Sequence, residues 1–135
     1  MELDIKKIDQ VVNDIFSIFD NRNNRKPDLD EIRQFFLTEA IITKREGEKV
    51  VVMTVDEFIT PRKRLLLDGT LTNFYEYETD CVTKVENGIA SRMSKYSKQG
   101  FMHGMDYRGS GKKHFQLVLE SGHWKVASIV WEDEL

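Results

Sequence analysis

The stretch that decides the fold is "WKVASIVWEDEL", residues 124–135. If it forms a β-strand, its apolar residues lie on both faces: Trp124, Val126 and Val130 on one, Ala127, Ile129 and Trp131 on the other. A strand with one face in water alternates apolar and polar residues, because successive side chains point to opposite faces. Both faces of this strand therefore need a cover.

The preceding segment "HFQLVLE" at 114–120 and the turn residues Ser121-Gly122 predict a hairpin with this strand. Pairing across the turn puts Leu119 opposite Trp124, Leu117 opposite Val126 and Phe115 opposite Ser128. This face is apolar enough to pack on helices. The other face is predicted to lie outside the sheet, and it carries Gln116, Val118, Ile129 and Trp131. An apolar outer face favours a homodimer through these four residues.

The length of the chain fits one domain over residues 1–135, and its composition is ordinary for a globular domain. The chain carries 20 basic and 23 acidic residues, a formal net charge of −3, so we expect no nucleic-acid partner. The single cysteine, Cys81, cannot form an internal disulfide. The N-terminus has no unbroken apolar run, so we expect no signal peptide, no membrane span and a cytoplasmic location.

Helices are predicted in the first half of the chain. Apolar residues recur at helical spacing over residues 4–19, which predicts one amphipathic helix. "DLDE" at 28–31 and "TVDE" at 54–57 read as capping boxes that begin two further helices. Pro61 interrupts the third helix, and Gly69 is placed to end it.

Strands dominate the second half. Residues 40–43 and 49–55 are predicted to pair as a hairpin, and residues 71–85 and 89–96 pair across Asn87-Gly88. Residues 99–111 hold four glycines and are predicted to be a long loop. Three helices with a mostly antiparallel sheet indicate an α+β fold.

This order of elements resembles the nuclear transport factor 2-like superfamily, which includes SnoaL-like polyketide cyclases and ketosteroid isomerase. The segments that carry the resemblance are "FITPRKRLL" at 58–66, "GIASRMSKY" at 88–96 and "WKVASIVW" at 124–131. The resemblance implies a cone: a strongly bent sheet wrapped around about three N-terminal helices, with a pocket at its open end. It also implies that dimers form through the outer sheet face. Some members are enzymes, and others are binding or association modules.

The Asn87-Gly88 register predicts which residues of this hairpin face the cone interior. Thr83 pairs with Arg92 and Thr79 with Tyr96, so these share one face. Extending the strand by two residues at a time adds two tyrosines, and the predicted ligand-binding set is Tyr75, Tyr77, Arg92 and Tyr96. The alternative is that the tyrosines fill the core with their hydroxyl groups in water.

The opposite face of the same strand carries Glu76, Glu78 and Asp80. These carboxylates read most simply as a solvated ladder of charges. A β-bulge between residues 74 and 80 would turn some of them inward. Glu76 is then the first candidate for a general acid or base, and we include it among the candidate ligand-binding residues.

Two further residues are candidates for the site. His103 lies in the glycine-rich segment, where it either lines a pocket mouth or stays a surface histidine. Arg62, in "TPRKR", either binds an anion or pairs with a carboxylate, and pairing is favoured. The histidines show no metal-ligand spacing, so we expect no metal and no cofactor.

These observations predict a small-molecule-binding or association domain whose partners are a small hydrophobic ligand and a second copy of the chain. The alternative is a SnoaL-like lyase or isomerase acting on a hydrophobic, oxygenated small molecule. Ketosteroid isomerase-like members use a carboxylate and a tyrosine on the first helix. Phe16 and Phe19 stand on the corresponding stripe here and can do neither task, so that chemistry is assigned to no residue.

Overall fold

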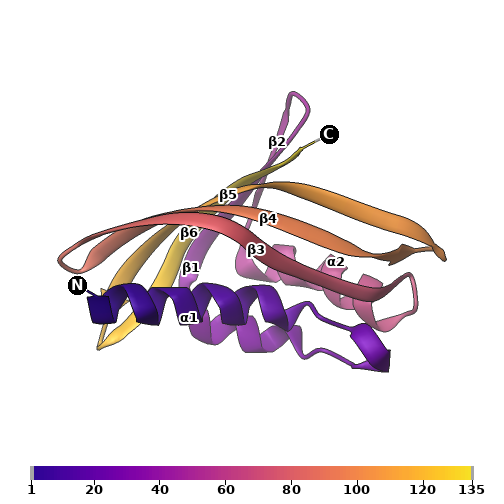
Figure 1. The fold of residues 1–135 in the computed structure, drawn as a ribbon, viewed down its shortest axis with the longest axis horizontal. Coiled ribbons are helices and arrows are strands. Elements are labelled where there is room, and N and C mark those ends of the chain that lie inside the picture. Colours follow the sequence, from indigo (N-terminus) through magenta and orange to yellow (C-terminus); the bar gives the residue numbers. More distant parts are fainter. Residues whose placement is uncertain (1, 135) are drawn as a thin grey trace.

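The computed structural model describes residues 2–134, which form one curled sheet with helices against one side (Figure 1). The helical elements are α1 (Glu2–Ile18), the 3-10 helices η1 (Arg22–Asn24) and η2 (Leu29–Phe35), and α2 (Val55–Leu67). The strands are β1 (Phe36–Glu46), β2 (Lys49–Met53), β3 (Leu71–Glu86), β4 (Ile89–Met102), β5 (Met105–Glu120) and β6 (His123–Glu134).

The six strands form one sheet in the order β2-β1-β6-β5-β4-β3. Only β1 and β6 pair in parallel, and the other neighbours are antiparallel. The helices all lie on one side of this sheet (Figure 1). The predicted α+β cone is therefore confirmed, as an open, strongly bent sheet over helices.

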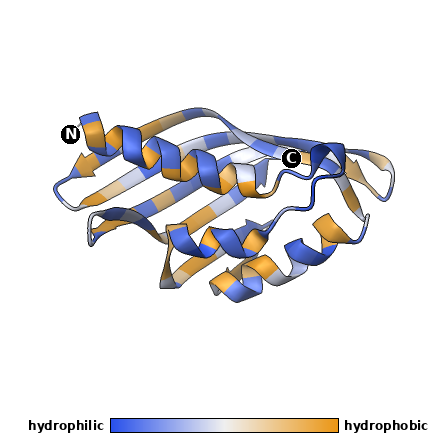
Figure 2. Cartoon of the chain, turned by 90° about the horizontal axis from the view of Figure 1, so that it is seen from below, coloured by the Kyte–Doolittle hydropathy of each residue, from blue (hydrophilic) through white to orange (hydrophobic). Residues whose placement is uncertain are grey.

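The core lies between α1, α2 and the concave face of the sheet. Ile8, Val12 and Phe16 form the buried stripe of α1. Seen from the helix side, α1 crosses the strands with apolar residues recurring along its length (Figure 2). Phe16 packs against Phe115 of β5 at a ring-centre distance of 6.4 Å. None of the helices within residues 2–134 is long and apolar enough to cross a membrane.

The predicted helix signals are confirmed in part. Thr54 and Glu57 form the predicted capping box at the start of α2. Pro61 does not divide this helix, which runs from Val55 to Leu67. At the other predicted box, residues 28–31, the Asp28 carboxylate accepts a hydrogen bond from the Asp30 amide, whereas the Glu31 amide donates to the Asp28 carbonyl oxygen. The segment that follows is a 3-10 helix.

The predicted loop over residues 99–111 is wrong, because β4 and β5 form one long hairpin that turns at His103-Gly104. Two of its glycines make room for side chains of the neighbouring strand. A Cβ at Gly111 would lie 2.4 Å from the Tyr96 hydroxyl oxygen, and one at Gly109 would lie 2.8 Å from Lys98 Cε. These glycines therefore serve close packing within a sheet and not a loop.

A β-bulge in β3 changes which residues face the helices. The Asn87-Gly88 register holds from the turn as far as the predicted pair of Cys81 with Ser94. Beyond it, Glu78 takes the place opposite Tyr96 that was predicted for Thr79. Because one extra residue reverses the inside-outside alternation, Glu76 and Glu78 turn inward.

A second bulge answers the question raised by the terminal strand. Leu117 pairs with Val126 as predicted, but Gln116 then pairs with Ser128 and Phe115 with Ile129, which leaves Ala127 as the extra residue. Apolar residues therefore face inward at even positions before Ala127 and at odd positions after it. Trp124, Val126, Ile129 and Trp131 are all at most 5% exposed. One side of the strand, not two, is covered by the helices.

Candidate functional site

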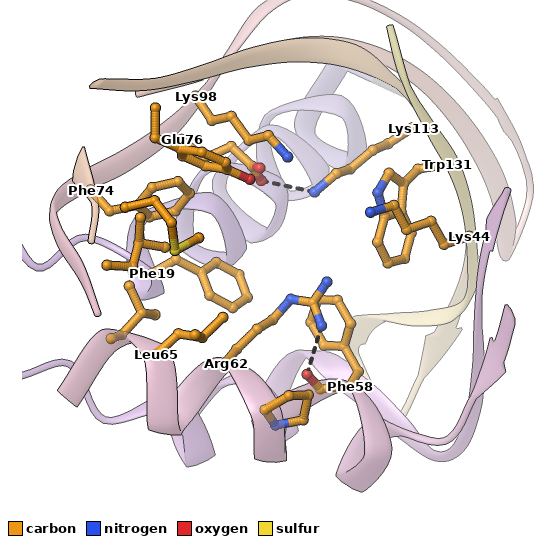
Figure 3. Close-up of a pocket in the computed structure, with 15 residues that line it drawn as sticks. Phe19, Lys44, Phe58, Arg62, Leu65, Phe74, Glu76, Lys98, Lys113 and Trp131 are labelled. Atoms are coloured by element: carbon orange, nitrogen blue, oxygen red, sulfur yellow. Dashed lines mark hydrogen bonds and ion pairs between the residues drawn. The ribbon is translucent and has the colours of Figure 1, made fainter. Parts of the chain in front are cut away.

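A cavity of about 200 Å³ lies between α2 and the concave face of the sheet (Figure 3). Its walls are largely apolar and come from the residue after α1 and from α2, β3, β4, β5 and β6. They include Phe19, Phe58, Leu65, Leu66, Leu71, Phe74, Met102, Tyr107 and Trp131. Five charged side chains also reach the cavity: Lys44, Arg62, Glu76, Lys98 and Lys113. An apolar cavity with a few convergent polar groups is the usual form of a ligand site.

Aromatic rings fix the wall nearest α2. The rings of Phe58 and Trp131 meet edge to face, with centres 5.7 Å apart and planes at 85°. Phe19 meets Phe58 in the same way at 5.9 Å and 89°. Such T-shaped pairs favour one orientation of each ring. The three rings therefore hold one another in place along this wall.

Glu76 and Lys113 form an ion pair inside the cavity. Lys113 Nζ donates to Glu76 Oε2 at 2.8 Å, and the two side chains are 11% and 10% exposed. Burial holds the pKa of Lys113 below its usual range, and the charges of Arg62 and Lys98 act in the same direction, against the effect of Glu76. Glu76 reaches this position because the bulge at Thr79 turns it inward.

A second polar group borders the cavity around Asp133. Lys98 donates to Asp133 Oδ2 at 3.0 Å, Lys44 lies 3.4 Å from the same oxygen, and the Tyr96 hydroxyl donates to Oδ1. Burial opposes the charge of Asp133, yet the hydrogen bond from Tyr96 and the charge of Lys98 hold its pKa below the usual range. Burial, followed by Asp133, raises the pKa of Tyr96, which therefore stays protonated.

Arg62 differs from the other cations of the cavity. Its Nη1 donates to the Phe58 carbonyl oxygen at 2.9 Å, and its guanidinium carbon lies 3.9 Å from the centre of the Phe58 ring. No carboxylate of residues 2–134 lies within ion-pair distance of it. The pairing with a carboxylate that the sequence favoured is not found. Burial lowers the pKa of Arg62, although an arginine stays charged in proteins.

The structure separates the predicted ligand-binding residues. Glu76 lines the cavity, and Tyr96 lies behind its wall, with Lys113 Nζ 4.7 Å from the centre of the ring. Tyr75 and Tyr77 do not face the interior as expected, because the bulge places them on the other face of β3, where their rings stack at 5.6 Å. Arg22 covers Tyr75 from outside at 3.9 Å. His103 is exposed in the β4–β5 turn and lines no part of the cavity.

Arg92 faces the helices, as predicted, but it belongs to another cluster. It is 2% exposed, and its guanidinium group donates to Glu78 and Asp9, and to Thr83 at 3.1 Å. Ser94 completes the cluster by donating to Glu78. These bonds join α1 to β3 and β4 and leave Arg92 away from the cavity.

Of the four residues predicted for a dimer interface, two lie on the outer face of the sheet and two lie inside. Gln116 and Val118 lie on the outer face of the sheet, paired with Ser128 and Lys125. Ile129 and Trp131 lie inside, 4% and 5% exposed, and Trp131 lines the cavity. The expectation that Ile129 and Trp131 lie outside is wrong, because the bulge at Ala127 reverses their side.

Sequence reasoning missed the lysines of the cavity. Lys98 and Lys113 lie just before and just after the predicted loop of residues 99–111, and only the register of a continuous β4–β5 hairpin puts them on the same face as Tyr96. The turn residues His103-Gly104 were the signal that could have predicted that hairpin. Within residues 2–134, no group of histidine, cysteine or carboxylate side chains is arranged to hold a metal ion.

The ion pair yields a prediction about stability. Lys113→Met leaves the inward-facing Glu76 without its ammonium partner, and we expect the free energy of unfolding to fall by about 3 kcal/mol. Replacing both residues, as Lys113→Met with Glu76→Met, removes the unpaired charge and should recover most of that loss. Urea denaturation at neutral pH measures both changes.

The control for this test is Lys112→Met, since Lys112 is the exposed neighbour on the other face of β5. We expect this variant to stay close to the wild-type stability. A double variant whose loss equals the sum of the losses of Lys113→Met alone and Glu76→Met alone would show that the pair does not interact as described.

Known proteins resemble this chain in fold but not in sequence. No protein-family model matches the chain, and no curated protein matches it in sequence. Solved structures do match. A putative scytalone dehydratase from Novosphingobium aromaticivorans aligns over 98% of this chain and 85% of its own, with 12% identity and a TM-score of 0.76. A hexachlorocyclohexane dehydrochlorinase (LinA) Type 2 aligns over 98% and 86%, with 11% identity and a TM-score of 0.77. An NTF-2-like protein of unknown function from Silicibacter pomeroyi aligns over 98% of each chain, with 15% identity and a TM-score of 0.66. The chain therefore has the nuclear transport factor 2-like fold that its sequence resembles.

Proposed function

We propose that the chain binds a small molecule in the cavity beneath α2. The observation that carries this proposal is the set of charged side chains directed into an otherwise apolar cavity. Burying charge costs free energy unless the charge is paired or used, so such an arrangement is typical of a binding site. The volume of about 200 Å³ suits a single-ring compound, since an apolar cavity of about 150 Å³ holds benzene.

The two tryptophans provide a direct readout of binding. Trp131 lines the cavity, whereas Trp124 lies elsewhere and its indole nitrogen donates to Asp4 at 3.1 Å. We expect phenol, benzyl alcohol or benzoate to shift the indole N–H resonance of Trp131 and to leave that of Trp124 in place. Two-dimensional NMR of ¹⁵N-labelled protein measures both signals in one titration.

Two methionines at the ends of the β4–β5 turn give matched variants. Met102 lines the cavity, and Met105 is 73% exposed. Met102→Trp fills part of the cavity and should weaken binding at least tenfold, whereas Met105→Trp should bind as the wild type does. The proposal fails if none of the compounds moves the Trp131 signal, or if Met102→Trp binds them unchanged.

A second candidate function is lyase or isomerase chemistry, and the position of Glu76 favours it. A carboxylate inside the cavity can take a proton from the carbon next to a carbonyl group, while the Lys113 ammonium group donates to the carbonyl oxygen as it becomes negative. The distance of 2.8 Å between Lys113 Nζ and Glu76 Oε2 places the two groups side by side. Two of the solved neighbours are named as a dehydratase and a dehydrochlorinase, which is compatible with this candidate.

Hydrogen exchange tests this candidate without a known substrate. In deuterated water, 4-acetylbenzoate should exchange its methyl protons faster with the protein than in buffer alone, as followed by proton NMR. Glu76→Gln should reduce the catalysed rate by a factor of about 100 or more. The control is Glu86→Gln, at an exposed residue near the β3–β4 turn. Equal rates for the wild type and Glu76→Gln would exclude Glu76 as the base.

We also propose that two copies associate through the outer face of the sheet. One row of paired residues crosses all six strands on that face, and it runs Val82, Met93, His114, Val130, Thr43 and Val52. Val82, Met93, Val130 and Val52 are each between 48% and 61% exposed. Gln116 and Val118 lie beside this row on the same face. A self-complementary contact of two such rows would remove these side chains from water.

Val130→Glu tests the association, because a two-fold contact brings each new charge into the interface twice. Sedimentation at micromolar concentration should find a wild-type dimer and a Val130→Glu monomer. The matched control is Leu3→Glu, since Leu3 is 64% exposed on α1, which lies on the other side of the sheet (Figure 1). A monomeric wild type, or a Val130→Glu protein that remains dimeric, would contradict the proposal.

A further inference from the structure

We propose that the ligand of the cavity is an aromatic carboxylate and that Arg62 binds its carboxylate group. This inference rests on the proposed binding function and names the chemical class of the ligand.

The charges around the cavity do not balance. Four cationic side chains line it, and only Glu76 among the lining residues is acidic. Asp133, just outside the lining, accepts from Lys98 and lies near Lys44, and Glu76 accepts from Lys113. The three lysines thus have carboxylate partners, while Arg62 has none within residues 2–134. An anion bound beside Arg62 would supply the missing charge.

The guanidinium group of Arg62 is held in one orientation. Its carbon lies 3.9 Å from the centre of the Phe58 ring and 5.6 Å from that of Trp131, and its Nη1 donates to the Phe58 carbonyl oxygen. Figure 3 shows the group reaching from α2 into the cavity, toward Lys113 on the opposite side. Its planar fork of N–H groups matches the two oxygens of a carboxylate, which it can bind through parallel hydrogen bonds.

The neighbouring cations favour the same ligand. The positive charges of Arg62 and Lys98 both lower the pKa of Lys113, in addition to the larger effect of burial, so each of them repels Lys113 across the cavity. Glu76 is the one carboxylate among the residues that line this space. A carboxylate between Arg62 and Lys113 would relieve the repulsion.

The walls specify the rest of the molecule. Phe58 and Trp131 stand edge to face beside Arg62, and Phe74 and Tyr107 form a second aromatic pair at 6.3 Å. An aromatic ring fills such walls, whereas acetate and inorganic phosphate leave them in contact with water. The structure therefore favours a compound with a ring and a carboxylate over a small free anion.

Benzoate and benzamide test the charge, because they share size and shape and differ in the carboxylate. With the Trp131 indole resonance as readout, we expect benzoate to bind at least tenfold more tightly than benzamide. We expect acetate to bind at least tenfold more weakly than benzoate. Arg62→Gln should remove the preference for benzoate and leave benzamide binding nearly unchanged, which also shows that the variant is folded.

A second variant of Arg62 separates the effect of the planar guanidinium group from that of its positive charge, and a variant of Arg64 is the control. Arg62→Lys keeps the charge but loses the planar fork, so its benzoate affinity should fall between those of the wild type and Arg62→Gln. Arg64→Gln, at an exposed position of the same helix, should bind benzoate as the wild type does.

The outcomes distinguish the two claims. Equal affinities for benzamide and benzoate, or an undiminished preference in Arg62→Gln, would overturn the carboxylate inference and leave the binding function standing. Acetate as tight as benzoate would overturn the aromatic part. A Trp131 signal that responds to neither benzoate nor any neutral compound would overturn the binding function itself.

Discussion

Two single-residue bulges, at Thr79 in β3 and Ala127 in β6, bring a carboxylate and an aromatic ring to the concave face of the sheet. A further register shift between Thr72 and Tyr75 returns Leu71 to the same face. Side chains alternate along a strand with a period of two, so one extra residue exchanges the inside and outside sets beyond it. The bulge at Thr79 brings Glu76 inside, and the bulge at Ala127 brings Trp131 inside. Without them, the cavity would lose its carboxylate and an aromatic wall.

The charges brought inside divide into two groups with different consequences. Around Arg92, the charges of Glu78 and Asp9 are satisfied by hydrogen bonds, so that cluster fastens α1 to the sheet. In the cavity, Lys113 is paired while Arg62 lacks a carboxylate among the described residues. A buried charge that is paired and hydrogen-bonded is compensated, whereas an unpaired buried charge costs stability unless a ligand pairs it. This contrast is the reason for placing binding at Arg62 rather than at Arg92.

Local patterns in the sequence were enough for the fold but not for the site. The helical stripe of residues 4–19, the capping box at Thr54 and the Asn87-Gly88 turn are signals that neighbouring residues supply, and they predict the α+β class. The cone is what the resemblance to the nuclear transport factor 2-like superfamily implies. The bulges depend on how whole strands bend around the helices, and no turn residue marks Thr79 or Ala127. The sequence prediction therefore places Tyr75, Tyr77, Ile129 and Trp131 on the wrong side, and only its alternative of a bulge between residues 74 and 80 turns Glu76 inward. The glycines of residues 99–111 wrongly predicted a loop for a related reason. Gly111 makes room for Tyr96, which lies on another strand, so local sequence does not show why a glycine stands there.

The central claim is that the two bulges set the faces of the sheet, and cross-strand nuclear Overhauser effects between backbone protons test it most directly. The account predicts contacts of Phe115 with Ile129 and of Tyr96 with Glu78, the pairs that the bulged registers create. Contacts of Phe115 with Ser128 and of Tyr96 with Thr79 would show unbroken strands. That result would return Glu76 and Trp131 to the outer face and contradict the account of the cavity.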